Sequence, residues 1–504
     1  MQKSKRLGKT FVLISSLVFV FAGHTFANQR IYLNLENAVN IALSSSHRIK
    51  QLELSIQRTK HWLDARQASL KSRVDMYLKL PDIQSISDYK WNSTLRMDEI
   101  VRQNTQLWQS ELSIKQPVVF LGYPTNGYVS LNYKIYQYKQ RDESDENTTF
   151  YNRLYMKYEQ PLFSINELKN NLERAELDLK ENQLRYIRDK VNILDDVADD
   201  YYDIFELAYR NKIYAQQLTL LEEIQYFVDE IATTDSSYNV DKMQITLENA
   251  NIKENLLENK SRLRMSLANM KQRLGLDSND SLIVNPVVHI SPISVNLDDA
   301  IASGLQLSPQ LRMFEIDKRQ AEIGVEYQKA QEAFKVNLEM TYGLEKQNED
   351  FQTIWAQYDN SNSVTLNAYI PLWDWGLRRA RIQAEQVNVE KSKLRIEEQN
   401  EEIKKRITNS HTNLIEYQQR AINMQEGVQM AKSLCEISIR KFMDRSISLQ
   451  DLLQVIARYS ETEKKFIETY LGYRNALLNL MVNTYFDYEK GKSLLELYDF
   501  DSHS

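Results

Sequence analysis

The chain contains the same kind of segment twice, and this repeat constrains its fold more than any other feature of the sequence. The first copy starts at Leu33 and reads LNLENAVNIALSSSHRIK, and the second starts at Val295 and reads VNLDDAIASGLQLSPQLR. Leu35 corresponds to Leu297, which lies 262 positions later. A repeat at this distance indicates two similar halves, so the fold must be understood as a duplicated unit.

Each copy continues from a helix into a strand. Apolar residues keep a roughly helical period from Leu35 to about Leu70. The period changes to two over residues 72–81, where apolar side chains such as Val74 and Met76 alternate with polar ones. Residues 335–345 alternate in the same way, at the same offset of 262. Such alternation predicts strands with two different faces.

A second strand in each half ends in a proline that leads into a helix. The segments FYNRLYMKYEQPLF and SVTLNAYIPLWDWG predict strands at 149–162 and 363–372. Pro161 and Pro371 mark strand-to-helix junctions, because proline stops a strand and suits the start of a helix. These prolines are 210 positions apart rather than 262, so the first half holds 52 additional residues at roughly 83–148. The inserted segments ELSIKQPVVF and GYVSLNYKIYQYK predict one more strand pair.

Very long helices follow both prolines. Apolar residues spaced by four and three predict long helices at 163–231 and 375–443 and return helices at 241–275 and 449–485. This heptad seam is typical of helices that pack side by side. Cys435 lies on the seam, which predicts a buried and unreactive side chain.

Helix lengths indicate how these elements are arranged. A helix of about 68 residues is about 100 Å long, and one of about 35 residues is about 53 Å long. The first helix and the return helix of each half, stacked end to end, therefore match one long helix. A linker at 277–296 joins the repeats 28–276 and 297–490 at mid-height, and residues 491–504 form a tail. The predicted fold is mainly α, with a duplicated helix-strand-strand-helix-helix unit.

The N-terminus has the features of an export signal. Residues 1–27 carry four basic residues, an apolar run from Phe11 to Ala22, and small residues before a cleavage point near Ala27. We expect this signal peptide to be removed. The remaining chain has 59 basic and 69 acidic side chains, a balance that argues against nucleic-acid binding. With no cysteine directly after the signal, N-terminal lipidation is not expected.

The residue types needed for common enzyme chemistry are scarce or badly placed. Cys435 is the only cysteine, and the histidines are never paired at metal-ligand spacing. The sequence has no glycine-rich phosphate loop and no GxSxG motif. We therefore expect neither an enzyme nor a bound cofactor or metal.

The strand regions point toward a membrane. Tryptophans gather there, at Trp91, Trp108, Trp355, Trp373 and Trp375, and only Trp62 lies elsewhere. Aromatic belts at both rims are typical of transmembrane barrels, although an aromatic-rich soluble sheet is the alternative. Open sheet edges do not survive in lipid, so a barrel shared between identical chains is required, most simply a trimer with four shared strands per chain. The insertion at 83–148 then either extends this wall or lies outside it. We favour a lid or an extracellular hairpin, because the repeat already supplies two strands per half.

The order of these motifs resembles the TolC-type outer-membrane efflux proteins. The resemblance rests on both copies of the first motif, on QPLFSINELK and IPLWDWGLRRARIQAE, and on the turn that begins MDRSISLQDLLQVIARYSE. It covers nearly the whole mature chain. It implies a homotrimer with a twelve-stranded β-barrel in the outer membrane and a twelve-helix α-barrel that crosses the periplasm. Such a protein is a passive exit duct for drugs, small molecules or proteins, and it docks with a periplasmic adaptor and an inner-membrane pump.

The resemblance also implies a gate at the helical tip. Its acidic ring position matches Asp451, while the second acidic position is Gln454, a departure that weakens any cation-binding ring. Asp241, Asp444 and Arg445 are further gate candidates. A threefold ring of aspartates in a narrow lumen would favour cations. Alternatively, Asp451 simply favours the start of the return helix.

One rival function belongs to a different class. A secreted coiled-coil protein, such as an adhesin-like stalk, accounts for the signal and the heptads. It does not account for alternating segments at matching points in both halves. An enzyme acting on envelope polymers is a more remote option, because the many acidic residues lie on helix faces where solvation explains them.

Overall fold

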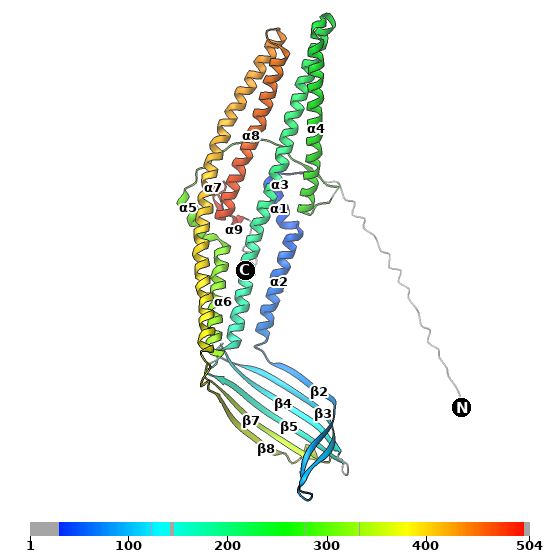
Figure 1. The fold of residues 1–504 in the computed structure, drawn as a ribbon, viewed down its shortest axis with the longest axis vertical. Coiled ribbons are helices and arrows are strands. Elements are labelled where there is room, and N and C mark those ends of the chain that lie inside the picture. The colour runs from blue at the N-terminus through cyan, green and yellow to red at the C-terminus, as the bar shows by residue number, and fades with distance from the viewer. Residues whose placement is uncertain (1–29, 122, 142–145, 278, 332, 498–504) are drawn as a thin grey trace, which may run out of the picture.

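The protein is a long helical body with a curved β-sheet at one end (Figure 1). The computed structural model describes residues 30–497 except 122, 142–145, 278 and 332. The expected signal peptide at 1–27 lies outside the described residues. None of the described helices is both long and apolar enough to cross a membrane.

Both halves of the chain contain a helix pair, strands of the sheet, a long helix and a return helix, in that order. The first half contains β1 (Arg30–Tyr32), α1 (Leu35–Ser45), α2 (His47–Ala68), β2 (Arg73–Asn92), β3 (Met97–Phe120), β4 (Tyr123–Arg141), β5 (Glu146–Leu162), α3 (Glu167–Thr234), the 3-10 helix η1 (Ser236–Tyr238), α4 (Asn239–Leu274) and β6 (Ser281–Ile283). The second half contains α5 (Leu297–Leu307), α6 (Pro309–Gln331), β7 (Lys335–Asn348), the 3-10 helix η2 (Thr353–Trp355), β8 (Asp359–Tyr369), α7 (Leu377–Met443), α8 (Leu449–Thr484), β9 (Phe486–Asp487), β10 (Lys492–Ser493) and α9 (Leu494–Leu497).

The repeated sequence motif encodes two helix starts in each half rather than one. Asn34 and Asn296 cap α1 and α5 through their side-chain oxygens. Ser46 and Ser308 then cap α2 and α6 in the same manner. A serine cap satisfies a backbone N–H that has no partner inside the helix. The single first helix expected in each half is therefore a pair of helices that meets at a serine.

The long helices exchange partners halfway along the body. α3 has 68 residues and α7 has 67, so each is about 100 Å long. Towards the tips the helices lie in the order α7, α8, α3, α4, and towards the sheet in the order α7, α6, α3, α2 (Figure 1). The buried seam of α7 includes Ile403, Ile407, Leu414 and Cys435. Burial raises the pKa of the Cys435 thiol, as expected for a packed and unreactive cysteine.

The sheet has six strands in the order β2-β3-β4-β5-β7-β8, and every neighbouring pair is antiparallel. This differs from the four strands per chain that were expected. The inserted residues form the outer part of β2 together with β3 and β4, which lie in the sheet between the rest of β2 and β5. The expectation that the insertion lies outside the wall is therefore wrong for these strands. Only the end of the β2–β3 hairpin, beyond Ser85 and Asn104, extends past the last paired residue of β4.

Candidate transport path

One face of the sheet is apolar across all six strands. Val74, Ile114, Leu131, Met156 and Tyr342 are successive register partners and lie in one row across five strands. Each of these side chains is exposed in the single chain, between 38% for Ile114 and 62% for Val74. On β8 this row ends at Asn362, and the exposed apolar side chains are Val364 and Leu366. An apolar exposed area of this size is unusual in a soluble protein and indicates contact with lipid or with another protein.

The opposite face carries a network of charges. Lys157 on β5 forms ion pairs with Glu159 on its own strand and with Glu339 on β7. Towards the outer end, Arg153 lies 3.3 Å from Glu345, measured from Nε to Oε2. The Tyr155 hydroxyl donates to Glu111 on β3 at 3.1 Å, which links an inserted strand to this network.

The two faces of the sheet differ in the exposure of their side chains as clearly as in their polarity. Thr341, on the polar face of β7, is 9% exposed, whereas its neighbour Met340, on the apolar face, is 43% exposed. Crowded side chains belong to the concave side of a curved sheet. The sheet therefore has a concave polar side suited to water and a convex apolar side suited to hydrocarbon.

The five tryptophans in the strand region occupy both ends of the sheet. Trp373 and Trp375 lie next to the helices, are 75% and 89% exposed, and contact each other edge to face. At the outer end, Trp355 in η2 contacts Phe351, which in turn contacts Phe150 on β5. Trp108 is on β3, opposite Gln137 of β4, and Gln137 is opposite Phe150.

Trp91 lies farther out, near the end of the β2–β3 hairpin, and is 65% exposed. Together these residues form two aromatic zones at opposite ends of the sheet, which is the arrangement seen at membrane interfaces.

The two junction prolines sit where the sheet meets the long helices, but in different ways. Pro161 is still part of β5, opposite Asn337 of β7, and α3 begins after the cap Asn166. Pro371 follows the end of β8, and α7 begins only at Leu377. In that second junction the Asp374 carboxylate accepts hydrogen bonds from the backbone N–H of Arg378 and Gly376, and these bonds lower its pKa.

At the tip, Asp451 lies in the first turn of α8 and is exposed. Its backbone N–H donates to Ser448 Oγ at 3.1 Å, and the Ser448 hydroxyl donates to the Asp451 carboxylate at 2.7 Å. Ser448 therefore caps α8 and the Asp451 carboxylate lies in its first turn, which fits the second of the two roles expected for Asp451. Gln454 lies one turn further along α8 and is also exposed.

The remaining gate candidates lie on both tips. Asp241 is in the first turn of α4. Asp444 is the C-cap residue that follows α7, and Arg445 comes next with a left-handed backbone, φ 58°. Arg445 is close enough to act on Asp235 at the other tip, whose pKa is lowered mainly by the Ser237 backbone N–H and further by Arg445. The structure thus brings Arg445 towards the α3–α4 tip.

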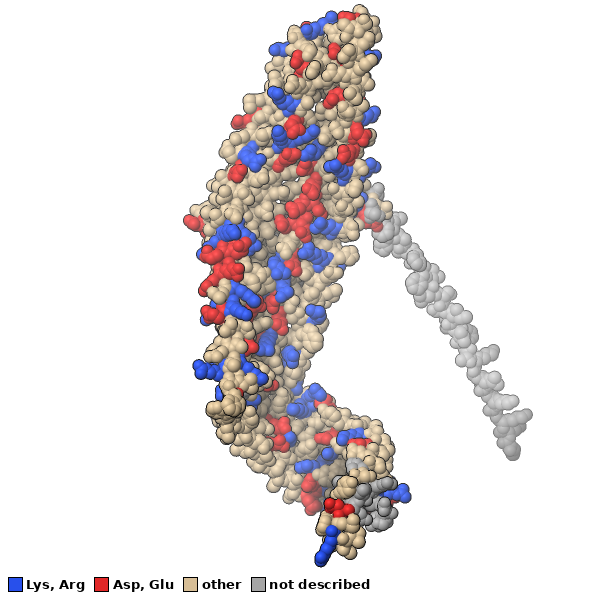
Figure 2. Space-filling view, in the orientation of Figure 1, with Lys and Arg blue, Asp and Glu red and all other residues tan. Residues whose placement is uncertain are grey.

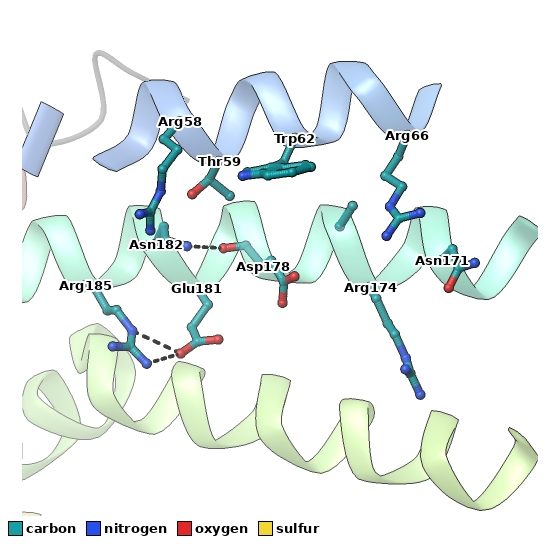
Figure 3. A pocket seen from close by; sticks show the side chains of 11 residues that line it. Arg58, Thr59, Trp62, Arg66, Asn171, Arg174, Asp178, Glu181, Asn182 and Arg185 are labelled. Atoms are coloured by element: carbon teal, nitrogen blue, oxygen red, sulfur yellow. Dashed lines mark hydrogen bonds and ion pairs between the residues drawn. The ribbon is translucent and has the colours of Figure 1, made fainter. Parts of the chain in front are cut away.

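A polar groove follows the outer edge of the helical body between α2 and α3 (Figure 3). Its α2 side includes Trp62, which is 66% exposed, and the exposed Arg58 and Arg66. Its α3 side includes Arg174 and also Arg185, which pairs with Glu181. Because α2 is the last helix on this side of the body, the groove lies at an edge rather than between two halves of the chain.

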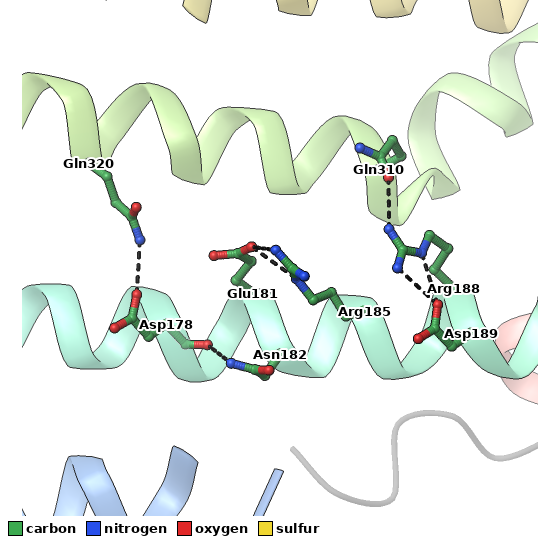
Figure 4. Close-up of polar contacts among 8 residues, drawn as sticks. All are labelled: Asp178, Glu181, Asn182, Arg185, Arg188, Asp189, Gln310 and Gln320. Atoms are coloured by element: carbon green, nitrogen blue, oxygen red, sulfur yellow. Dashed lines mark hydrogen bonds and ion pairs between the residues drawn. The ribbon is translucent and has the colours of Figure 1, made fainter. Parts of the chain in front are cut away.

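The opposite side of α3 is fastened to α6 by polar contacts (Figure 4) and by a small apolar cluster of Leu177, Leu184, Met313 and Ile316. Gln320 donates to the Asp178 carboxylate at 3.0 Å, and Arg188 donates to Gln310 at 3.3 Å. Lys and Arg are interspersed with Asp and Glu along the visible face of the helical body (Figure 2). These contacts hold the helices in a solvated layer.

Comparison with known proteins agrees with this architecture. Residues 300–482 match the family model described as outer membrane efflux protein. The whole fold is similar to the CmeC outer membrane channel of Campylobacter jejuni, with a TM-score of 0.67 and 12% identity over 93% of this chain and 89% of that one. The chain has the fold of the TolC-type outer-membrane efflux channels. The resemblance inferred from the motifs is therefore confirmed.

Two further channels have the same fold. CusC has a TM-score of 0.65 and 11% identity over 90% of this chain and 92% of that one. VceC from Vibrio cholerae has a TM-score of 0.62 and 11% identity over 89% and 95%. No protein with a curated function is significantly similar in sequence to this chain. Outer-membrane efflux channels are transport ducts rather than enzymes, in agreement with the sequence expectation.

Two features of the candidate transport path, one in the sheet and one at the helical tips, could not be found from the motifs. The charge network on the polar face joins residues from β3, β5 and β7, so only its alternation was visible in the sequence. The contact between the tips is also remote in sequence, with Phe227 of α3 packed edge to face on Phe442 of α7.

Proposed function

We propose that three copies of this chain form an outer-membrane exit duct that extends into the periplasm. The duct conducts drugs, small molecules or proteins passively from an inner-membrane pump, within a tripartite efflux or type I secretion system. The observation that carries this proposal is the two-faced sheet at the end of a helical body about 100 Å long. The family match and the fold of the similar channels support it.

The two long edges of the chain support assembly into a ring. One edge consists of β8 and α7, and the other of β2, α2 and α4. Exposed apolar side chains follow these edges, on α7 at Val387, Leu394, Ile415, Met430, Leu434 and Ile437, and on α4 at Val240, Met243, Leu247, Leu257 and Met265. Seven-residue spacings recur in both sets, so neighbouring copies can continue the helical layer as a coiled coil. Four helices abreast in each copy would give a wall of twelve helices.

The proposed partners follow from the position of the tips. The α3–α4 and α7–α8 tips point away from the sheet and would meet a periplasmic adaptor (Figure 1). We propose that Asp451, Gln454, Asp241, Asp444 and Arg445 contribute to the gate there, and that a signal peptide ending near Ala27 directs export. The tryptophans Trp91, Trp108, Trp355, Trp373 and Trp375 would lie at the membrane interfaces.

A coiled-coil stalk is the less favoured function. It gives no reason for a sheet with an apolar face that is exposed on all six strands. Cell fractionation separates the two functions, because a duct requires detergent for extraction from the outer membrane, whereas a stalk dissolves in salt or urea.

Paired cysteine variants test the assignment of the two faces. Ser363 and Val364 are neighbours on β8, and their side chains belong to the polar and apolar faces. In a Cys435→Ala background, Ser363→Cys should react with a charged, membrane-impermeant thiol reagent. Val364→Cys should react only with a reagent dissolved in the lipid. Equal reaction of both variants with the charged reagent would refute the membrane assignment.

A further inference from the structure

We propose that the membrane wall of this duct is a barrel of eighteen strands, six from each of three copies, closed by pairing β8 of one copy with β2 of the next. This inference rests on the proposed trimeric duct and specifies its wall. It departs from the twelve strands that the family resemblance implies.

The inserted strands are an integral part of the wall. β3 pairs with β2 from Lys115–Arg73 to Met97–Asn92 and with β4 along its other side. β4 in turn pairs with β5 from Tyr128–Glu159 to Arg141–Glu146. A wall of four strands per chain would require two of these ladders to break, leaving unpaired backbone groups in lipid.

The two outermost strands have directions suited to each other. β2 runs away from the helical body and β8 runs back to it, so β8 of one copy and β2 of the next are antiparallel. The same is true of all five pairs inside the chain. Within the described part of the chain, β2 pairs only with β3 and β8 only with β7.

The stagger of the strands sets the register of the strand seam, which is the pairing of β8 in one copy with β2 in the next. The register row that begins at Arg73, the first residue of β2, reaches Ser363 on β8. Ser363 lies six residues before Tyr369, where β8 ends at the helical body. Arg73 and Tyr369 both lie at that boundary, so closure places Arg73 of one copy beside Tyr369 of the neighbouring copy. The register row is thereby displaced by six residues for every six strands. A shear equal to the strand number corresponds to strands tilted by about 36°, which is usual for barrels.

This register pairs like side chains with like. It places the apolar Leu366 opposite Met76 and Val364 opposite Leu78, all of which are more than half exposed in the single chain. On the polar face it places Thr365 opposite Tyr77. The pairing ends at Ser363 opposite Lys79, immediately before the irregularity of β2 between Lys79 and Asp82. Both faces of the wall therefore continue across the seam without a break.

The strand number determines the width of the outer opening. Barrel diameter grows roughly linearly with strand number, so eighteen strands give a lumen about half as wide again as twelve. Barrels of this size hold an aqueous channel. The outer membrane end is then not the narrowest part of the duct, and selection of cargo by size takes place nearer the helical tips.

Disulfide cross-linking across the seam tests the pairing. Full-length Tyr77→Cys/Thr365→Cys protein, in a Cys435→Ala background, is oxidised in outer membranes and run on a denaturing gel. The expected products are covalent dimers and trimers, which neither single variant gives. The matched control is Asn337→Cys/Asn367→Cys, a register pair inside the chain, which should stay at monomer size.

The outcomes separate this inference from the proposed function. Cross-linking of Tyr77→Cys/Thr365→Cys within one chain, or its absence in a trimer that fractionates with the outer membrane, overturns the seam and leaves the duct intact. A protein that is not trimeric or not in the outer membrane overturns the duct itself. As a check without substitutions, electron cryomicroscopy of the native trimer in lipid discs should resolve eighteen strands, and twelve would refute the proposal.

Discussion

Ser448 and Asp451 exchange two hydrogen bonds at the start of α8, one from the Asp451 backbone N–H at 3.1 Å and one from the Ser448 hydroxyl at 2.7 Å. The residue that resemblance assigns to the gate is therefore also part of a helix cap. The two roles predict different results for different substitutions.

Ser448→Ala should destabilise the start of α8. The substitution removes the acceptor of the Asp451 N–H and should cost about 1 kcal/mol. Hydrogen exchange should become faster at the amides of the first turn of α8, with little change elsewhere. The matched control is Ser446→Ala, an exposed residue of the same turn that contributes only its backbone N–H, to Lys441. Equal effects of both substitutions would contradict the capping role.

Asp451→Asn should separate charge from capping. The asparagine oxygen still accepts from the Ser448 hydroxyl, while the charge is lost, and Asp451→Ala loses both. If three Asp451 carboxylates face the lumen, both variants should need about tenfold more trivalent cation for block of single-channel current, a loss of about 1.4 kcal/mol in ion binding. Wild-type block in Asp451→Asn would leave Asp451 with its capping role alone.

Glu463→Gln should make the protein less sensitive to high pH. Glu463 on α8 is 8% exposed, and burial raises the pKa of its carboxyl above the ordinary 4.5, against the opposing effects of Tyr459 and Lys212. The folded state therefore binds this proton more tightly than the unfolded state, so its contribution to stability is lost as pH rises above 4.5.

We expect the thermal midpoint of helix unfolding to rise in Glu463→Gln at pH 8 and to change little at pH 4. Glu461→Gln, two residues earlier on α8 and exposed, should behave as wild type at both pH values. An equal shift of the Glu463→Gln midpoint at both pH values would show that ionisation is not involved.

Gly472→Ala should destabilise the α7–α8 pair, whereas Gly427→Ala should not. A methyl group at Gly472 would lie 2.5 Å from ring atoms of Tyr417 on α7, and such overpacking costs about 1–3 kcal/mol. At Gly427, also in a helix, the nearest atom would be 4.0 Å away, so alanine gains up to about 1 kcal/mol of helix propensity. Chemical denaturation in detergent should give the highest midpoint for Gly427→Ala, an intermediate one for the wild type and the lowest for Gly472→Ala.

The helical body is the part of the fold that the sequence could predict. A spacing of four and three residues sustained from Ile403 to Cys435 leaves few alternatives. It predicted a helix at 375–443, and α7 spans Leu377–Met443 with Ile403, Ile407 and Leu414 buried on the predicted seam. The break between α5 and α6 also has a local signal in the sequence, because Pro309 disfavours helical geometry at the residue before it.

The order of strands in the six-stranded sheet is the part that the sequence could not predict. Alternation in the inserted residues indicated two strands, but a strand's neighbours depend on pairing with residues far along the chain. Lys115 opposite Arg73, and Tyr128 opposite Glu159, are relationships that no local pattern contains. The approach of Arg445 to Asp235 is similarly a product of helix packing rather than of either turn.

The open ladders of β2 and β8 have a genetic consequence. In the proposed ring each chain supplies one strand to each of two seams, so a chain whose β8 cannot pair would disrupt a ring in which both neighbours are normal. When normal and defective chains are made in equal amounts and mix at random, only about one eighth of the rings are free of defective chains. If the chains assemble in this way, a defect confined to this sheet edge would therefore be inherited as a dominant trait.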